Sequence, residues 1–176
     1  MQLKRINIKK LTNSALFAAV ICIVSPFVIQ IGVVPLSLAN LAVMLCAFTL
    51  PTSSAVLSVV VYILLGLCGL PVFASFQGGA HILFGATGGF LWGYILLCVF
   101  CSSVRNKKSL GAKLLLCFCG LLCCYTLGVL QYCFVLKTSI LNALLVCVLP
   151  FLVFDIIKCV LAFFLSQKLK SVIKFN

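Results

Sequence analysis

One acidic side chain and one lysine stand three positions apart in an otherwise apolar stretch. Asp155 is the only Asp or Glu in the chain, Lys158 follows it, and hydrophobic residues continue to Leu165. Positions i and i+3 share one face of an α-helix, so the two charged groups point the same way. An ionised group in a membrane helix costs about 2.5–3.5 kcal/mol on insertion scales, and it is tolerated where it faces a partner, a cavity or a ligand. The pair therefore predicts a binding pocket near one membrane surface.

The two groups offer complementary chemistry. A carboxylate accepts hydrogen bonds from N–H groups, whereas an ammonium donates to a carbonyl or pairs with a carboxylate. Because Asp155 and Lys158 are one helical turn apart, they can hold a single polar end of a ligand. The alternative is an ion pair that only keeps helices in register.

Composition places this pair in a membrane protein. The chain has 176 residues, of which 65% are hydrophobic and 8% are charged, whereas soluble domains average about 25% charged residues. The formal net charge of +12 would suggest nucleic acid in a soluble chain. Here, however, eleven of the thirteen Lys and Arg residues fall in three clusters outside the apolar runs, at positions 4–10, 105–113 and 168–174. Such clusters mark cytoplasmic ends and contact anionic lipid headgroups, so we expect a lipid bilayer and no nucleic acid as partner.

The twelve cysteines do not indicate a metal site or a disulfide framework. All lie in or beside apolar runs, and none belongs to a paired C-x-x-C arrangement with histidines nearby, which a zinc site needs. Cys98 and Cys101 form one isolated C-x-x-C. We interpret the cysteines as small hydrophobic residues of a helical bundle, and we expect no metal and no cofactor.

The hydrophobic runs predict an all-α integral membrane protein with six transmembrane helices in one domain over residues 1–176. The expected helices cover about 11–31, 36–50, 54–67, 90–104, 114–135 and 151–167. Pro26 is expected to kink the first helix, and Gly32 to Pro35 to form a turn before the second. Residues 138–149 are apolar but short, which favours a bent or re-entrant segment over a full crossing.

Six crossings place both termini on one side of the membrane. The three basic clusters then share that side, including the basic segment 1–10, and Lys137 lies on the other. By the positive-inside rule both termini are cytoplasmic. Asp155 and Lys158 consequently fall in the outer half of the sixth helix.

The least regular stretch of the chain lies between the third and fourth expected helices. Residues 71–89, PVFASFQGGAHILFGATGG, hold five glycines, several polar side chains and the lone His81. Irregular backbone at membrane depth occurs where it is buried in protein or lines a cavity, so this outer loop is a second candidate for the pocket wall. For His81 a structural role is a simpler interpretation than a ligand or a catalyst.

Small residues in the first helix could let another helix approach closely. Ala15 and Ala19 are four apart, as are Ser14 and Ala18. Ordinary packing within the chain is the alternative explanation for this spacing.

Three segments together resemble signatures of the BioY family, the biotin-binding S components of energy-coupling factor (ECF) transporters. They are YILLGLCGLPVFA at 62–74, GATGGFLWG at 85–93 and LPFLVFDIIK at 149–158. The resemblance covers nearly the whole chain. It implies six membrane helices in a bacterial cell membrane and a biotin pocket open to the outside. As partners it implies a transmembrane coupling protein and two cytoplasmic ATPases.

The resemblance also assigns residues to the biotin site. It carries the family's last-helix acid and lysine onto Asp155 and Lys158, and the glycine-rich loop onto Phe73, Ser75, Phe76, Gln77, Gly78 and Gly79. The next motif corresponds to Thr87, Gly88 and Gly89, followed by Phe90, and the family's contact with its coupling partner to Ala15 and Ala19. We hypothesise that Asp155 and Lys158 hold one end of biotin and the loop the other, with Phe73, Phe76 and Phe90 covering the bicycle. These aromatics are equally compatible with lipid or core packing.

The chain departs from the family pattern at several positions. The family usually has proline at the position of Ala86 and often tyrosine at Phe90. In the second helix, threonine and glutamine are usual where this chain has Ser37 and Ala39, which leaves the contribution of that helix to a pocket open.

Other function classes lack support in the residues. The chain has no G-x-x-x-x-G-K-[ST] phosphate-binding loop, so energy for transport must come from partners. One acid and one histidine in different regions form no catalytic constellation, so we expect no enzyme. A stand-alone channel or secondary carrier, or an S component for another vitamin, remains as an alternative.

Overall fold

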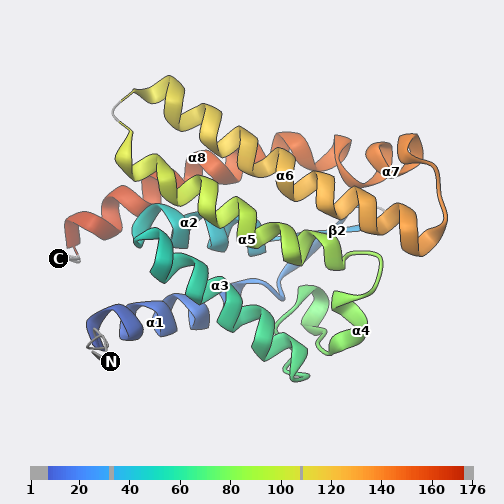
Figure 1. Ribbon diagram of the computed structural model, residues 1–176, viewed down its shortest axis with the longest axis horizontal. Helices are drawn as coiled ribbons and strands as arrows, with labels where there is room; N and C mark the ends of the chain where they lie inside the picture. Colours follow the sequence, from blue (N-terminus) through green and yellow to red (C-terminus); the bar gives the residue numbers. More distant parts are fainter. Residues whose placement is uncertain (1–7, 32–33, 108, 173–176) are drawn as a thin grey trace, which may run out of the picture.

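The chain forms a bundle of helices with one short β-hairpin, as shown by a computed structural model that describes residues 8–31, 34–107 and 109–172 (Figure 1). In chain order the elements are α1 (Ile8–Val24), β1 (Val28–Ile31), β2 (Val34–Ser37), α2 (Ala39–Thr49), α3 (Thr52–Leu67), η1 (Ala74–Phe76), α4 (Ala80–Leu83), α5 (Gly88–Ser103), η2 (Val104–Asn106), α6 (Leu110–Leu136), α7 (Ile140–Cys147) and α8 (Leu149–Val172). Helix α5 packs along α6, α2 along α8, and α1 along α3. The expected helical fold is confirmed.

The prediction for the first helix was wrong in its second half. Helix α1 ends at Val24, and Pro26 ends the helical segment instead of kinking it, because proline has no N–H to continue the helical hydrogen bonds. The chain then forms β1, which pairs antiparallel with β2. The second helix consequently begins at Ala39 and not near residue 36. Of the predicted turn at 32–35, residues 32 and 33 lie outside the described residues.

The remaining helices agree with the sequence within a few residues, with one extension. Residues 140–147 form the short helix α7, as expected for an apolar segment too short to cross a bilayer. Helix α8 continues to Val172 and so carries Lys168 and Lys170 in its last turns. Helices α6 and α8 are long and apolar enough to span a membrane, and α2, α3 and α5 are shorter apolar helices.

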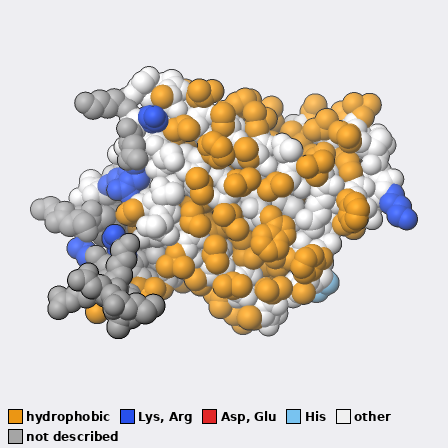
Figure 2. All heavy atoms as spheres, in the orientation of Figure 1, with side chains coloured by type: hydrophobic (Ala, Val, Ile, Leu, Met, Phe, Trp, Pro, Cys, Tyr) orange, Lys and Arg blue, Asp and Glu red, His pale blue; other side chains and the backbone are white. Residues whose placement is uncertain are grey.

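The surface separates apolar and basic side chains along the bundle. Both chain ends lie at the same end of the molecule (Figure 1). Figure 2 shows Lys and Arg side chains mainly at that end, and hydrophobic side chains over most of the face between the two ends. Large hydrophobic residues such as Phe134 and Phe164 are 86% and 64% exposed, which suits a surface that contacts lipid.

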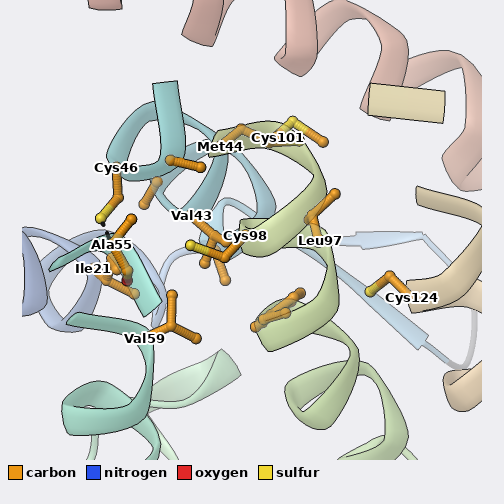
Figure 3. Packing of buried hydrophobic residues seen from close by; sticks show 14 of the residues in the cluster. Ile21, Val43, Met44, Cys46, Ala55, Val59, Leu97, Cys98, Cys101 and Cys124 are labelled. Carbon is orange, nitrogen blue, oxygen red and sulfur yellow. Dashed lines mark hydrogen bonds between the residues drawn. The ribbon is translucent and has the colours of Figure 1, made fainter. Parts of the chain in front are cut away.

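The interior is packed with apolar residues and thiols. All twelve cysteines are free thiols. Figure 3 shows four of them, Cys46, Cys98, Cys101 and Cys124, beside Ile21, Val43, Met44, Ala55, Val59 and Leu97. The described residues contain no cluster of three or more His, Cys, Asp or Glu side chains that would hold a metal ion.

The loop from Pro71 to Thr87 is held by backbone contacts that suit glycine. Gly79 has a φ of +104°, a conformation that other residues rarely adopt, and its N–H donates to the carbonyl of Gly66 at 2.7 Å. On α6, the Gln131 amide donates to the carbonyls of Leu83 and Gly85, both at 2.8 Å. These bonds tie the loop to α3 and α6.

We expect Gly88→Ala to destabilise the protein by about 1–3 kcal/mol, the usual cost of overpacking. A Cβ at Gly88 would overlap the Leu83 carbonyl, which is backbone and cannot move aside. Thermal unfolding in detergent, followed by the fluorescence of Trp92, measures the change. Gly111→Ala is the control, because a Cβ there meets nothing closer than 3.8 Å. Equal losses of stability in the two variants would contradict the packing argument.

Candidate functional site

The Asp155 carboxylate is the centre of a buried hydrogen-bond network. Its side chain on α8 is almost fully enclosed, with 1% of the residue exposed. Oδ1 accepts from Lys158 Nζ at 3.0 Å. Oδ2 accepts from Asn40 Nδ2 of α2 at 2.9 Å and from the Tyr125 hydroxyl of α6 at 2.6 Å. Three helices that are distant in sequence are thus joined through one carboxylate.

Lys158 extends the network to the β-hairpin. The residue is 6% exposed, and Nζ donates to the backbone carbonyl of Ser37 at 2.8 Å. The Ser37 hydroxyl in turn donates to the carbonyl of Ser25 at 2.9 Å, and accepts from the N–H of Ala39 at 3.0 Å. The end of β2 and the start of α2 are therefore positioned by the same lysine and hydroxyl.

Hydrogen-bonding capacity remains unused around the ion pair. Asn40 Oδ1 is the one buried side-chain oxygen or nitrogen among the described residues that has no hydrogen-bond partner. An ammonium has three donors and a carboxylate about four acceptor positions. Lys158 uses two of its donors, and Asp155 uses three acceptor positions. A buried acceptor without a partner is uncommon, and a water or a ligand is the usual explanation.

Asn40, Asp155 and Lys158 line a cavity of about 360 Å³, within the range of small-molecule sites. Its wall is formed by α2, α3, the segment from Phe73 to Thr87, α5, α6, α7, α8 and the residues around the hairpin. The lining residues are Ser25, Leu36, Ser37, Ala39, Asn40, Tyr62, Phe73, Ala74, Ser75, Gln77, Ile82, Thr87, Phe90, Leu91, Tyr94, Tyr125, Cys147, Phe151, Asp155 and Lys158. The charged pair and the irregular loop, predicted separately from the sequence, meet in this cavity.

Seven of the twelve residues expected to bind the ligand line the cavity. They are Asp155, Lys158, Phe73, Ser75, Gln77, Thr87 and Phe90. Phe73 is buried and packs edge-on against Tyr62, with ring centroids 5.6 Å apart. Ser75 and Gln77 are exposed and form the outer part of the wall.

The other five, Phe76, Gly78, Gly79, Gly88 and Gly89, are not among the lining residues. Phe76 is 60% exposed and packs on Phe27 outside the cavity. Gly78 and Gly89 lie against the backbone of Leu70 and Leu127. The glycines shape the wall, and their close contacts are with the chain itself.

Sequence reasoning missed the partners of the charged pair. Asn40, Tyr94 and Tyr125 line the cavity, and the second helix contributes through Asn40 despite its departures from the family pattern. For Asn40, the sequence offered one indication, namely an amide side chain in an otherwise apolar helix. Tyr125 lies in a long apolar run with nothing to distinguish it. His81 is exposed and is not among the lining residues.

The two small-residue pairs of α1 face different surroundings. Ser14 and Ala18 are buried, and the carbonyl of Ser14 accepts from the Ser58 hydroxyl of α3 at 2.9 Å. Ala15 and Ala19 are exposed. The packing alternative therefore applies to the first pair, whereas the second pair lies on a free surface of the chain.

Comparison with known proteins gives consistent matches. The model of the BioY family matches residues 1–175. The biotin transporter BioY of Thermotoga maritima is 38% identical over 164 residues, covering 93% of this chain and 96% of the relative. A probable biotin transporter BioY of Pyrococcus horikoshii is 33% identical over 164 residues, covering 93% and 97%. The crystal structure of an S component for biotin from an ECF-type ABC transporter superposes with a TM-score of 0.83 at 24% identity, over 97% of this chain and 95% of that one; this match establishes the fold.

Proposed function

This chain belongs to the BioY family, and on that premise we propose that it is the substrate-capture subunit of an ATP-driven importer that binds biotin from the outer side of a bacterial cell membrane. It delivers the vitamin together with a transmembrane coupling protein and two cytoplasmic ATPases. The observation that carries the proposal is the buried Asp155–Lys158 pair, which faces a ligand-sized cavity with hydrogen-bonding capacity to spare.

The unused groups match the ureido end of biotin. A ureido group has two N–H donors and one carbonyl acceptor. Asn40 Oδ1 and Asp155 Oδ1 supply two acceptors, and the third N–H of Lys158 supplies one donor. The acidic tail is then directed towards Ser75 and Gln77. This orientation also keeps the ligand carboxylate away from the one buried carboxylate of the protein, where like charges would repel.

Aromatic side chains suit the apolar part of the ligand. Phe73, Phe90, Tyr94 and Phe151 line the cavity. They offer apolar surface for the thioether bicycle at little cost in side-chain entropy, because Phe and Tyr have two rotatable side-chain bonds.

The positions of the basic residues support six membrane crossings with both termini in the cytoplasm. The crossing helices are α1, α2, α3, α5, α6 and α8. The end that holds both termini carries the basic residues (Figure 2), which suits the cytoplasmic side. Lys137 follows α6 at the opposite end. Ala15 and Ala19, exposed on α1, offer the coupling protein a smooth surface for close helix packing.

The purified chain should bind biotin without any partner, while uptake should require the coupling protein, the ATPases and ATP. The reason is that this chain contains the cavity but no nucleotide-binding loop. Calorimetric titration with biotin, thiamine, riboflavin and folate measures selectivity. Accumulation of radiolabelled biotin in proteoliposomes, with and without the partners, measures transport.

Three results would contradict the proposal. Uptake without any ATPase would indicate a stand-alone carrier, and tighter binding of another vitamin would reassign the substrate. ATP hydrolysis by the purified chain alone would reject the role of a capture subunit.

A further inference from the structure

A second cavity lies at the opposite end of the bundle from Asp155. It measures about 290 Å³ and is lined by Phe48, Val104, Arg105, Lys113, Phe163, Ser166, Gln167 and Lys170. These residues come from the end of α2, from η2, from the start of α6 and from the last turns of α8. This is the end of the molecule where both termini lie (Figure 1).

Three cations, Arg105, Lys113 and Lys170, line this cavity, and no acidic side chain of the described residues is among its lining residues. Arg105 and Lys113 both act electrostatically on Lys170. The one acidic side chain of the protein, Asp155, is paired with Lys158 in the other cavity. Like charges gathered around a partly enclosed space repel each other more strongly than in open water, so an anion in this space would relieve the repulsion.

The structure leaves donors available for that anion. Arg105 uses Nη1 to donate to the carbonyl of Thr49 at 2.9 Å, at the end of α2. This bond fixes the guanidinium, and further N–H groups remain for a ligand. The Lys113 ammonium lies 5.9 Å from the centre of the Phe163 ring. Arg and Lys are the residues that bind phosphate oxygens, Arg in bidentate geometry and Lys as a point charge.

We propose that this cavity binds the phosphate headgroup of an anionic phospholipid of the cytoplasmic leaflet. A free phosphate would present the same chemistry, but the surroundings favour the lipid. Leu114 and Phe164, which follow the lining residues Lys113 and Phe163 in the sequence, are 57% and 64% exposed and offer apolar surface to acyl chains. Basic pockets between membrane helices on the cytoplasmic side suit such headgroups.

Removing two of the cations should weaken lipid binding selectively. Each Lys near a membrane surface contributes about 1 kcal/mol to attraction of anionic lipid, which is about fivefold in affinity. We therefore expect Lys113→Gln/Lys170→Gln to bind phosphatidylglycerol about 30-fold more weakly. Arg105 is left in place because it also bonds the backbone of α2. Native mass spectrometry of the full chain in non-ionic detergent, titrated with phosphatidylglycerol or phosphatidylcholine, measures the change.

The matched control is Lys107→Gln/Lys168→Gln. It lowers the net charge by the same amount as Lys113→Gln/Lys170→Gln. Both of its lysines are exposed at the end of the molecule that holds this cavity, and neither lines the cavity. We expect it to keep most of the affinity. Lys113→Arg/Lys170→Arg should also retain the lipid, because it preserves both cations. Biotin binding, at the other end of the bundle, reports that each variant is folded.

Several outcomes would overturn the proposal. Equal losses in the two glutamine variants would mean general attraction to a basic surface and no site. Equal binding of phosphatidylcholine would remove the role of the headgroup charge. Displacement of phosphatidylglycerol by inorganic phosphate, with phosphate retained by the wild-type chain, would assign the cavity to a free anion. Retention of phosphatidylglycerol by wild type in excess phosphate supports the lipid.

Discussion

Asp155→Asn should bind biotin about 100-fold more weakly than the wild-type chain, the loss expected when one member of a buried, hydrogen-bonded charge pair is truncated. The amide replaces one acceptor oxygen with a donor NH₂ group, which conflicts with the donors that Lys158, Asn40 and Tyr125 direct at the carboxylate. It also removes an acceptor that we assign to the ureido group. Calorimetric titration in detergent measures the loss.

Tyr125→Phe is the matched control for this experiment. It deletes one hydrogen bond to Asp155 Oδ2 and leaves the carboxylate charge unchanged. Because the carboxylate keeps its charge, both oxygens and its bond to Lys158, this variant should lose less affinity than Asp155→Asn. Unchanged biotin binding in Asp155→Asn would remove Asp155 from the site.

Asp155→Asn also tests which end of biotin the Asp155–Lys158 pair holds. Biotin amide lacks the acidic tail but keeps the ureido group. If the ureido group lies at Asp155, the amide should suffer the same loss as biotin on Asp155→Asn. A loss confined to biotin itself would place the carboxylate end at the pair and reverse the proposed orientation.

Lys158→Met should lower the free energy of unfolding by about 3–5 kcal/mol, because it leaves the buried carboxylate without its cation. Asp155→Asn/Lys158→Met should recover much of that loss, since no buried charge then lacks a partner. The double variant should still fail to bind biotin. Thermal and denaturant unfolding of the four proteins of this cycle separates the contribution to folding from the contribution to binding.

Lys168→Met on the same helix controls for the loss of a lysine at an exposed position. Exposed substitutions of this kind change stability by about 0.5 kcal/mol or less. A double variant as unstable as Lys158→Met would mean that hydrogen bonds to Ser37, and not the ion pair, dominate the role of the lysine. Biotin binding by the double variant would mean that the pair only holds helices in register.

The two cavities contain different combinations of charged residues. In the cavity at Asp155, one cation and one anion compensate each other, and donor and acceptor positions remain for a neutral polar group. In the cavity at Lys170, three cations have no acidic side chain among the described lining residues. A mixed-charge site favours a hydrogen-bonded ligand, whereas a like-charge site favours an anion.

The helical architecture and the charged pair were predictable from the sequence. Long apolar runs must become helices in lipid, because only a helix satisfies its own backbone within one segment. An Asp and a Lys at i and i+3 are costly in an apolar helix unless they face a partner, a cavity or a ligand, so the pair indicated the candidate site. The loop at 71–89 was also recognisable, because irregular backbone at membrane depth must be buried in protein or line a cavity.

The β-hairpin and the rest of the site depended on the tertiary structure. An apolar run containing Val and Ile is compatible with a strand or a helix, and only its pairing decided for strands after Pro26. Asn40 and Tyr125 stand 115 and 30 positions from Asp155, and no local pattern connects them to it. Residue type alone does not decide whether the glycines of the loop donate hydrogen bonds to a ligand or allow close packing of the backbone. Which of these applies depends on the backbone that approaches them, and that is a property of the folded chain alone.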